Sequence, residues 1–498
     1  MSNETFSFLE ATVTSFHQAV LDKKMTSAEL VRWYLERIET LDQNGPQIRS
    51  IVTVNPNALK EAEELDEFFA KHGTFKGPLH GVPVLIKDQA ETKGIPTTFG
   101  CKLFEAYIPE DDATVVKRLR QAGAIILAKT SMCDFAAGWF SFSSVTDYTK
   151  NPYAPEREAG GSSAGTSAGI AANFGLVGIG EDTGGSIRVP SSFNNLFGLR
   201  VTTGLISRHG FSPLVHFQDT AGPIARSVRD AAKLLDVLVG YDPLDPFTVA
   251  ASYTRDAGQY EASLENAAIQ QFRVGILANV FGPDDNPEAK AVNEAVHGAA
   301  EFLRRIGVEI VEGLELPDCG QWIKDTSLYI LQSKQDIGHF LRQRPGAPVK
   351  SFMDIYERGA FHPMNDLFHD IAGGPENPAE AADYYKMRVN QEAFRRNILD
   401  IMAQNELDFL LYPSVQVLPP TREELYALKW TCLTFPTNTV IASQSGLPAM
   451  SIPAGFTPDG IPVGFELLGK PFAEARLLQF AYGYEKLAKP RKTPNLNR

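Results

Sequence analysis

The hydrophobic pattern of this 498-residue chain changes near residue 82. Before that point, apolar residues recur every three or four positions, which predicts helices over about the first 75 residues. The clearest helix begins with Thr26 and Glu29, the two side chains of an N-terminal capping box. The apolar residues that follow them at helical spacing are Leu30, Trp33, Tyr34, Ile38 and Leu41.

After residue 82, short apolar runs alternate with amphipathic segments. Residues 82–86 and 124–127 are typical of buried strands, and residues 113–121 between them of a helix. The same alternation predicts later strands at 273–277, 308–311, 407–411, 449–452 and 463–467 and helices at 288–305 and 473–487. This order predicts an α/β fold with a mixed, mostly parallel central sheet that helices cover on both faces.

No linker-like or repeated segment divides the chain, so we expect a single domain over residues 1–498. Residues 320–404 are more helical than the rest, with a Pro- and Gly-bearing interruption near 344–378. We expect this region to be an elaboration that packs against the core and covers the substrate entrance.

Composition and charge narrow the class of protein. Apolar residues make up 43% of the chain and charged residues 21%, which is ordinary for a globular protein. The net charge is −13 and no basic block is present, so neither nucleic acid nor an anionic membrane is an expected partner. Without a secretion signal or an apolar run of membrane length, we expect a cytoplasmic protein.

The four cysteines, at positions 101, 133, 319 and 432, form no CxxC pair, and no histidine stands at metal-ligand spacing. We therefore expect reduced thiols, no disulfide framework and no metal site.

Ser186 is the first candidate for chemistry. It ends the run Asp182-Thr183-Gly184-Gly185-Ser186, and Pro190 shortly after it suits the first turn of a helix. Two glycines allow a tight turn with exposed N–H groups, which an acyl-transfer nucleophile needs near its oxyanion. Taken alone, the run is more typical of an ordinary Gly-Gly turn with a capping serine.

A second serine-bearing turn lies 24 positions earlier. Ser162 and Ser163 follow Gly160-Gly161 and precede a stretch of small residues, which permits close backbone packing. A phosphate-binding loop is the competing interpretation, but the Gly-Lys-Ser/Thr ending that it requires is missing.

Lys87 is the third candidate. It ends the apolar run Val82-Pro83-Val84-Leu85-Ile86, and burial there would disfavour its charged form and leave an amine able to accept a proton. A lone lysine at a strand end is more commonly a surface residue. The interpretation of Lys87 as a base therefore depends on the two serine-bearing turns that accompany it in the sequence.

Taken together, these segments resemble the amidase signature family. The matching segments are 81–88, 160–163, 182–190, 197–200, 222–226 and 446–455, and the resemblance is densest over residues 75–230, the signature core. The chain departs from the family pattern at Ala164, Glu181 and Val201, none of which removes a catalytic group.

The resemblance implies a mechanism and its residues. Ser186 corresponds to the nucleophile, Ser162 to a bridging serine that follows a cis peptide bond, and Lys87 to the base. The oxyanion hole corresponds to the backbone N–H groups of Thr183, Gly184, Gly185 and Ser186. The implied activity is hydrolysis of carboxamide C–N bonds through an acyl-enzyme, without cofactor or metal.

Aromatic residues suggest the character of the substrate. Met132 resembles a family segment beside the acyl site, and Phe135, Trp139, Phe140 and Phe142 follow it as candidates to line an apolar pocket. Weaker candidates are Trp430, Leu433 and Phe435. We therefore expect a small aryl or apolar amide as substrate, with esters and carbamates (urethanes) left open.

Two other functions use the same fold. One is the glutaminase subunit of a tRNA-dependent amidotransferase, which shares the triad and works with partner subunits. The other is a scaffold without catalysis. The sequence leaves the oligomeric state open.

Overall fold

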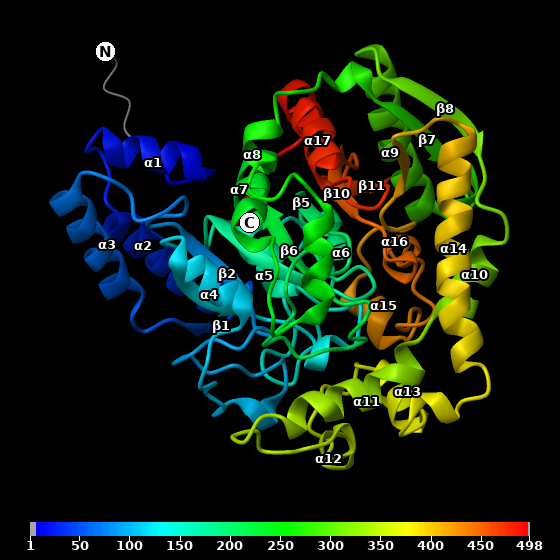
Figure 1. The fold of residues 1–498 in the computed structure, drawn as a ribbon, viewed down its shortest axis with the longest axis horizontal. Coiled ribbons are helices and arrows are strands. Elements are labelled where there is room, and N and C mark those ends of the chain that lie inside the picture. Colours follow the sequence, from blue (N-terminus) through cyan, green and yellow to red (C-terminus); the bar gives the residue numbers. More distant parts are fainter. Residues whose placement is uncertain (1–5, 497–498) are drawn as a thin grey trace.

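An 11-stranded sheet runs through the computed structural model, which describes residues 6–496. The strands lie in the order β1-β3-β2-β4-β6-β5-β10-β11-β9-β7-β8 (Figure 1). Their bounds are β1 Ile51–Val54, β2 Pro83–Lys87, β3 Ile125–Thr130, β4 Val177–Asp182, β5 Phe197–Arg200, β6 Thr220–Ala225, β7 Arg273–Leu277, β8 Glu309–Leu314, β9 Phe409–Pro413, β10 Ala449–Phe456 and β11 Pro462–Gly469.

The sheet is mixed, as predicted, but it is not mostly parallel. Within the described chain, β2 pairs in parallel with β3 and β4, and β7 with β8 and β9. The other six pairings are antiparallel. The difference arises in the middle of the sheet, where β4, β6, β5, β10, β11 and β9 alternate in direction.

Helices cover both faces of this sheet (Figure 1). α5 and α6 contact each other and the central strands, and α7 and α17 do the same. The bounds are α1 Val13–Leu21, α2 Ser27–Arg37, α3 Ala58–His72, α4 Thr114–Gln121, α5 Ala164–Ala171, α6 Arg188–Phe193, α7 Val228–Leu238, α8 Tyr260–Ser263, α9 Pro287–Arg305, α10 Cys319–Thr326, α11 Tyr329–Arg342, α12 Phe352–Glu357, α13 Leu367–Gly373, α14 Tyr384–Gln404, α15 Arg422–Tyr426, α16 Val440–Ser445 and α17 Glu474–Ala488.

Local sequence signals account for the elements near the N-terminus. Thr26 and Glu29 form the predicted capping box at the start of α2. The helical pattern continues past α2, but residues 38–43 wind as a π-helix instead of extending it. β1 lies in a region expected to be helical, because its four residues pair with β3 at the edge of the sheet.

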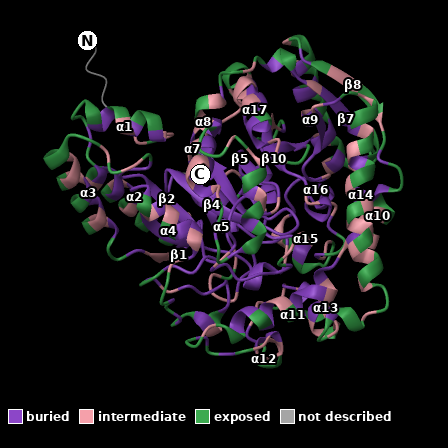
Figure 2. Ribbon diagram, in the orientation of Figure 1, coloured by how far each residue is buried: buried purple, intermediate pink, exposed green. Residues whose placement is uncertain are grey.

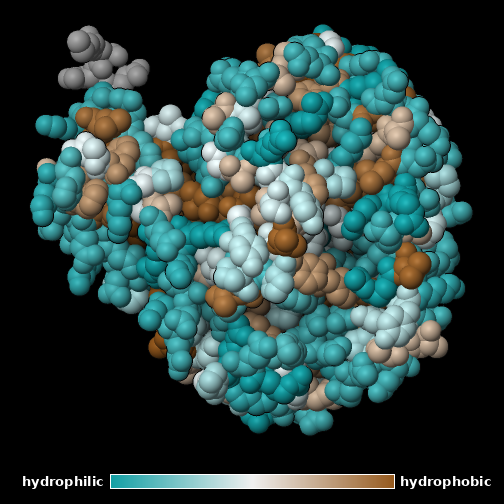
Figure 3. Space-filling model, viewed as in Figure 1, coloured by the Kyte–Doolittle hydropathy of each residue, from teal (hydrophilic) through white to brown (hydrophobic). Residues whose placement is uncertain are grey.

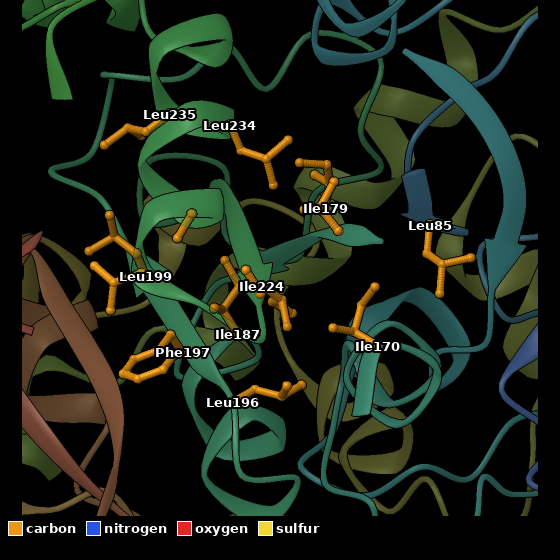
Figure 4. Packing of buried hydrophobic residues seen from close by; sticks show 14 of the residues in the cluster. Leu85, Ile170, Ile179, Ile187, Leu196, Phe197, Leu199, Ile224, Leu234 and Leu235 are labelled. Carbon is orange, nitrogen blue, oxygen red and sulfur yellow. The ribbon is translucent and has the colours of Figure 1, made fainter. Parts of the chain in front are cut away.

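The core of the molecule lies around the segments that bear the candidate chemistry. All residues of β2, β4 and α5 are buried (Figure 2). Figure 4 shows Leu85, Ile170, Ile179 and Ile224, from β2, α5, β4 and β6, which belong to one buried hydrophobic cluster. The small residues of α5 allow Leu85 to pack against the helix, because a Cβ on Gly169 would lie 2.8 Å from Leu85 Cδ1.

Residues 320–404 contribute most of α10 and all of α11 to α14. α11, α12 and α13 contact one another, and α14 packs against α10 and α16 (Figure 1).

On the face in Figure 3, hydrophilic residues dominate and apolar ones stand in small groups. None of the helices over residues 6–496 combines the length and the hydropathy needed to span a membrane.

Candidate active site

Lys87 ends β2 in the interior of the protein, where its side chain is 0% exposed. Its Nζ lies 2.7 Å from Ser162 Oγ, 3.2 Å from the carbonyl oxygen of Glu181 and 3.3 Å from Glu181 Oε2. The strand therefore delivers the amine to a hydroxyl group and a carboxyl group at the same time.

Ser162 lies in the glycine turn just before α5. The peptide bond between Gly161 and Ser162 is cis, as the family resemblance implied. Gly161 donates its N–H to the carbonyl oxygen of Trp139 at 2.6 Å, and a Cβ at Gly161 would lie 2.7 Å from the carbonyl oxygen of Phe140. The segment 139–140 thus fixes the turn that presents Ser162 to Lys87.

Ser186 lies in the turn between β4 and α6, close to the start of that helix. Ser163 donates its N–H to the Ser186 carbonyl oxygen at 3.1 Å, which ties the two serine turns together. Across the described chain, the Ser186 hydroxyl forms no hydrogen bond, and its residue is 3% exposed at the wall of a cavity. The structure therefore joins Lys87 to Ser162 directly and sets Ser186 beside them through the backbone.

Four consecutive backbone N–H groups follow β4, those of residues 183–186. None of them donates to an acceptor within residues 6–496. Thr183, Gly184 and Ser186 also line the cavity, so this turn can offer donors to a negatively charged oxygen.

A buried ion network lies beneath the same turn. Asp182 accepts hydrogen bonds from Arg188, Arg200 and the Ile187 N–H, and Arg188 also pairs with Glu466. Burial alone would raise the pKa of Asp182, but the two guanidinium groups outweigh it and lower that pKa to about 2. These contacts give Asp182 and Arg188 the role of supporting the turn.

The cavity at Ser186 has a volume of about 210 Å³. Since a cavity of about 150 Å³ accepts benzene, it has room for a small aromatic group. Among the described residues that line it there is no Asp, Glu, Lys, Arg or His. They are Ala136, Gly138, Trp139, Thr183, Gly184, Ser186, Leu214, Ile323, Ser327, Tyr329, Leu367, Gln416, Cys432, Leu433, Phe435, Pro436, Thr437, Asn438, Val440 and Gln444.

Of the five pocket residues expected from the sequence, Trp139 lines this cavity and donates its indole N–H to the carbonyl oxygen of Cys432 at 2.8 Å. Met132, Phe135, Phe140 and Phe142 are buried and are not among the residues that line this cavity.

Other contacts occupy their aromatic rings. Phe135 packs against Phe99 and Phe104, Phe142 stacks on His362, and Phe140 lies edge-on to Phe435.

Several wall residues were not individually identified from the sequence. Ile323, Ser327, Tyr329 and Leu367 belong to the region 320–404, so this region contributes to the wall. Leu433 and Phe435 line the cavity as weaker candidates, whereas Trp430 does not.

Glu181 is a further residue whose place beside Lys87 sequence reasoning missed. Its only signal was its departure from the family pattern, although the side chain is fully buried against the amine.

The described residues contain no group of three or more His, Cys, Asp or Glu placed to hold a metal ion. The four cysteines are free and buried, and burial raises the pKa of each thiol.

Comparison with known proteins finds similar sequences and structures. The model of the Amidase family matches residues 29–478. The chain is 31% identical to a glutamyl-tRNA(Gln) amidotransferase subunit from Synechococcus sp., over 95% of this chain and 91% of that protein. It is also 31% identical to the probable amidase At4g34880 of Arabidopsis thaliana, over 99% and 93%.

A solved structure is similar over its full length. The native peptide amidase from Stenotrophomonas maltophilia superposes with a TM-score of 0.87 at 31% identity, covering 99% of this chain and all of that one.

Proposed function

Because the chain belongs to the amidase signature family of C–N hydrolases, we propose that it cleaves small neutral amides with an aryl or other apolar group, using Ser186 as nucleophile. The observation that carries this proposal is the cavity at Ser186, which is largely apolar and, over its described wall, lacks charged side chains. Neutral apolar groups enter such a site without leaving a buried charge unpaired.

The reaction proceeds in two steps. Lys87 accepts the proton of Ser162 as Ser162 accepts that of Ser186, and Ser186 Oγ attacks the substrate carbonyl. The N–H groups of residues 183–186 stabilise the oxyanion. The proton then returns through Ser162 to the leaving amine, and water hydrolyses the acyl-enzyme by the same relay.

Esters and carbamates are further candidate substrates, because their carbonyl oxygens suit the same donors. The cavity binds the apolar part of the substrate. Which leaving group is cleaved depends on the attack by Ser186 and on proton transfer through Ser162.

The similarity to amidotransferase subunits supports a second function, glutamine hydrolysis for a partner subunit. Free glutamine carries an ammonium and a carboxylate, both of which need charged or strongly hydrogen-bonding partners when buried. The absence of charged residues among the described cavity residues therefore favours the amidase.

The test is a panel of anilides, primary amides, esters, carbamates and glutamine, given to the purified chain alone. We expect the highest kcat/KM for an aryl or apolar substrate and little glutamine hydrolysis. Glutamine as the preferred substrate would favour the second function.

Two variants test the assigned chemistry. S186A abolishes turnover and the covalent acyl adduct that mass spectrometry detects on the wild type, and K87A loses turnover while remaining folded. Wild-type turnover in K87A would overturn the mechanism.

A further inference from the structure

The Glu181 carboxyl group lies between the candidate base and a second acid. Its Oε2 lies 3.3 Å from Lys87 Nζ, and its Oε1 lies 3.2 Å from Thr183 Oγ1. The same Thr183 oxygen lies 2.6 Å from Asp219 Oδ1. Four buried side chains, Lys87, Glu181, Thr183 and Asp219, thus form one continuous chain.

The Thr183 hydroxyl has a single hydrogen but contacts two carboxyl groups. Asp219 is the closer acceptor, and it also receives the N–H groups of Leu214 and Val215, which suit a carboxylate. When Thr183 donates to Asp219, its lone pair faces Glu181 Oε1. That contact is a hydrogen bond only if Glu181 Oε1 carries a hydrogen.

The contacts of Lys87 lead to the same arrangement. A neutral amine has two hydrogens and one lone pair, and Lys87 Nζ has three oxygen neighbours. The Glu181 carbonyl oxygen can only accept, so it takes one hydrogen, and Glu181 Oε2 takes the other. The lone pair then faces Ser162 Oγ at 2.7 Å, the shortest of the three contacts, where it can receive a proton.

We infer that Glu181 is a positioning residue that remains protonated and directs the lone pair of Lys87 toward Ser162. This inference rests on the proposed function, in which Lys87 is the base. Every hydrogen bond then runs in one direction: Ser162 donates to Lys87, Lys87 to Glu181, Glu181 to Thr183, and Thr183 to Asp219.

The electrostatic surroundings of Glu181 favour its protonated form. Burial raises the pKa of Glu181, against the opposing effect of Lys87 and with the help of Asp219 and Asp182. Asp182 has its own partners in Arg188 and Arg200, so it does not compete for Lys87.

The proton balance of the reaction needs no rearrangement. When Ser186 attacks, its proton moves to Ser162 and the Ser162 proton moves to Lys87, which becomes an ammonium. Its three hydrogens then face Ser162 Oγ, the Glu181 carbonyl oxygen and Glu181 Oε2, all of which accept. Glu181 keeps its own proton throughout, and the Lys87 proton returns to the leaving amine.

The matched variants E181L and E181Q test this arrangement. In E181Q the amide oxygen can accept from Lys87 and the amide N–H can donate to Thr183, whereas E181L does neither. We expect kcat in E181L to fall at least about tenfold through misplacement of the base, and E181Q to recover most of that loss.

The pH profile separates a neutral from an ionised Glu181. If Glu181 is protonated, the acid limb of kcat/KM in E181Q stays within about half a pH unit of wild type. If Glu181 is a carboxylate, it favours the ammonium of Lys87, so E181Q moves the acid limb to lower pH by about one unit or more.

Infrared spectroscopy provides an independent readout. We expect a carbonyl band of a protonated carboxyl group in the wild type that E181Q lacks. If wild type and E181Q show the same protonated carboxyl bands, or if E181Q is as impaired as E181L, the inference is overturned. These outcomes leave the K87A test untouched, so failure of the inference is distinct from failure of the proposed function.

Discussion

Ser162 is the residue through which the candidate base reaches the nucleophile. Lys87 lies within hydrogen-bond distance of Ser162, and it makes no such contact with Ser186 within the described chain. The last link is therefore open in this structure, and catalytic hydrogen bonds commonly tighten in the complex with substrate.

The variant S162A removes this link without disturbing the other two side chains. We expect kcat to fall by about 10² to 10³ because proton transfer is lost, while KM changes little. Steady-state kinetics on the best substrate of the panel measures this, and circular dichroism checks that the variant is folded. A wild-type kcat in S162A would contradict the relay.

Asp182 is a single residue that contributes to the stability of the folded protein. In D182N the guanidinium groups of Arg188 and Arg200 lose a buried negative partner, so we expect a loss of about 3–5 kcal/mol in the free energy of unfolding. Urea unfolding measures it. The control is E301Q, which breaks an exposed ion pair with Arg304 and should leave the free energy of unfolding nearly unchanged.

The pH dependence of D182N has a definite sign. The pKa of Asp182 is about 2 in the folded protein and about 4 in an unfolded chain. Its contribution is therefore fully present above pH 4 and is lost as the pH falls toward 2. The difference between wild type and D182N should shrink over that range, and a constant difference would show that charge is not its cause.

At the scale of elements, the turn between β4 and α6 depends on its contact with α16. Ser443 of α16 donates its hydroxyl hydrogen to the carbonyl oxygen of Gly184 at 2.9 Å. Gly185 has φ +154°, and a Cβ there would lie 1.9 Å from Thr439 Oγ1. Both the backbone conformation and the space require glycine at this position.

We expect G185A to lower the free energy of unfolding by about 1–3 kcal/mol and to lower kcat/KM, because the donors of residues 183–186 move. Thermal unfolding and kinetics measure the two effects. The matched control is G298A in the exposed part of α9, where a Cβ meets nothing within 4 Å. Alanine at this helical position should raise the free energy of unfolding by up to about 1 kcal/mol. Equal behaviour of the two variants would refute the steric argument.

The elements that sequence could predict are those with a strong hydrophobic period. β7 and α9 lie within one residue of the predicted bounds, and β2 and α17 are shifted by one residue. β6, whose sequence is Thr-Ala-Gly-Pro-Ile-Ala, has no such period, because its neighbours β4 and β5 in the sheet supply its stability.

The candidate site likewise contains residues that the sequence predicts and residues that it does not. Motifs at Lys87, Ser162 and Ser186 are visible in the sequence because backbone geometry demands glycines and small residues around them. Most of the cavity wall is not visible in the sequence, because residues such as Tyr329 and Val440 reach it only through the packing of distant helices. Glu181 stood out as a departure, but its partner Asp219 lies 38 residues along the chain and could not be inferred.

At the scale of the whole molecule, the sheet joins the segment of the motifs to the C-terminal part. β5 pairs with β10, and β10 pairs with β11, so the strands that follow the motifs are continuous with those of the last 50 residues. This continuity places α16 on the Ser186 turn, and Val440 and Gln444 of α16 line the cavity. The two parts of the site therefore depend on one folded unit.

The interior of the protein also contains acidic groups that make the folded state more stable at low pH. Burial raises the pKa of Glu158 and Asp336 to about 7 each and that of Glu485 to about 8. In an unfolded chain these carboxyl groups lose their protons near pH 4. Between these values the folded state binds more protons than the unfolded state, so stability falls as pH rises.

We therefore expect the melting temperature to decrease from about pH 5 to about pH 8.5, because each such group contributes up to about 1.4 kcal/mol per pH unit while only its folded form is protonated. The net charge of −13 acts in the same direction through self-repulsion. Differential scanning calorimetry at constant ionic strength measures the trend. The variant E158Q should flatten the curve, because an amide can keep the contacts of Glu158 with Ser141 and does not titrate. A melting temperature that rises over this range would show that these carboxyl groups are ionised in the folded protein.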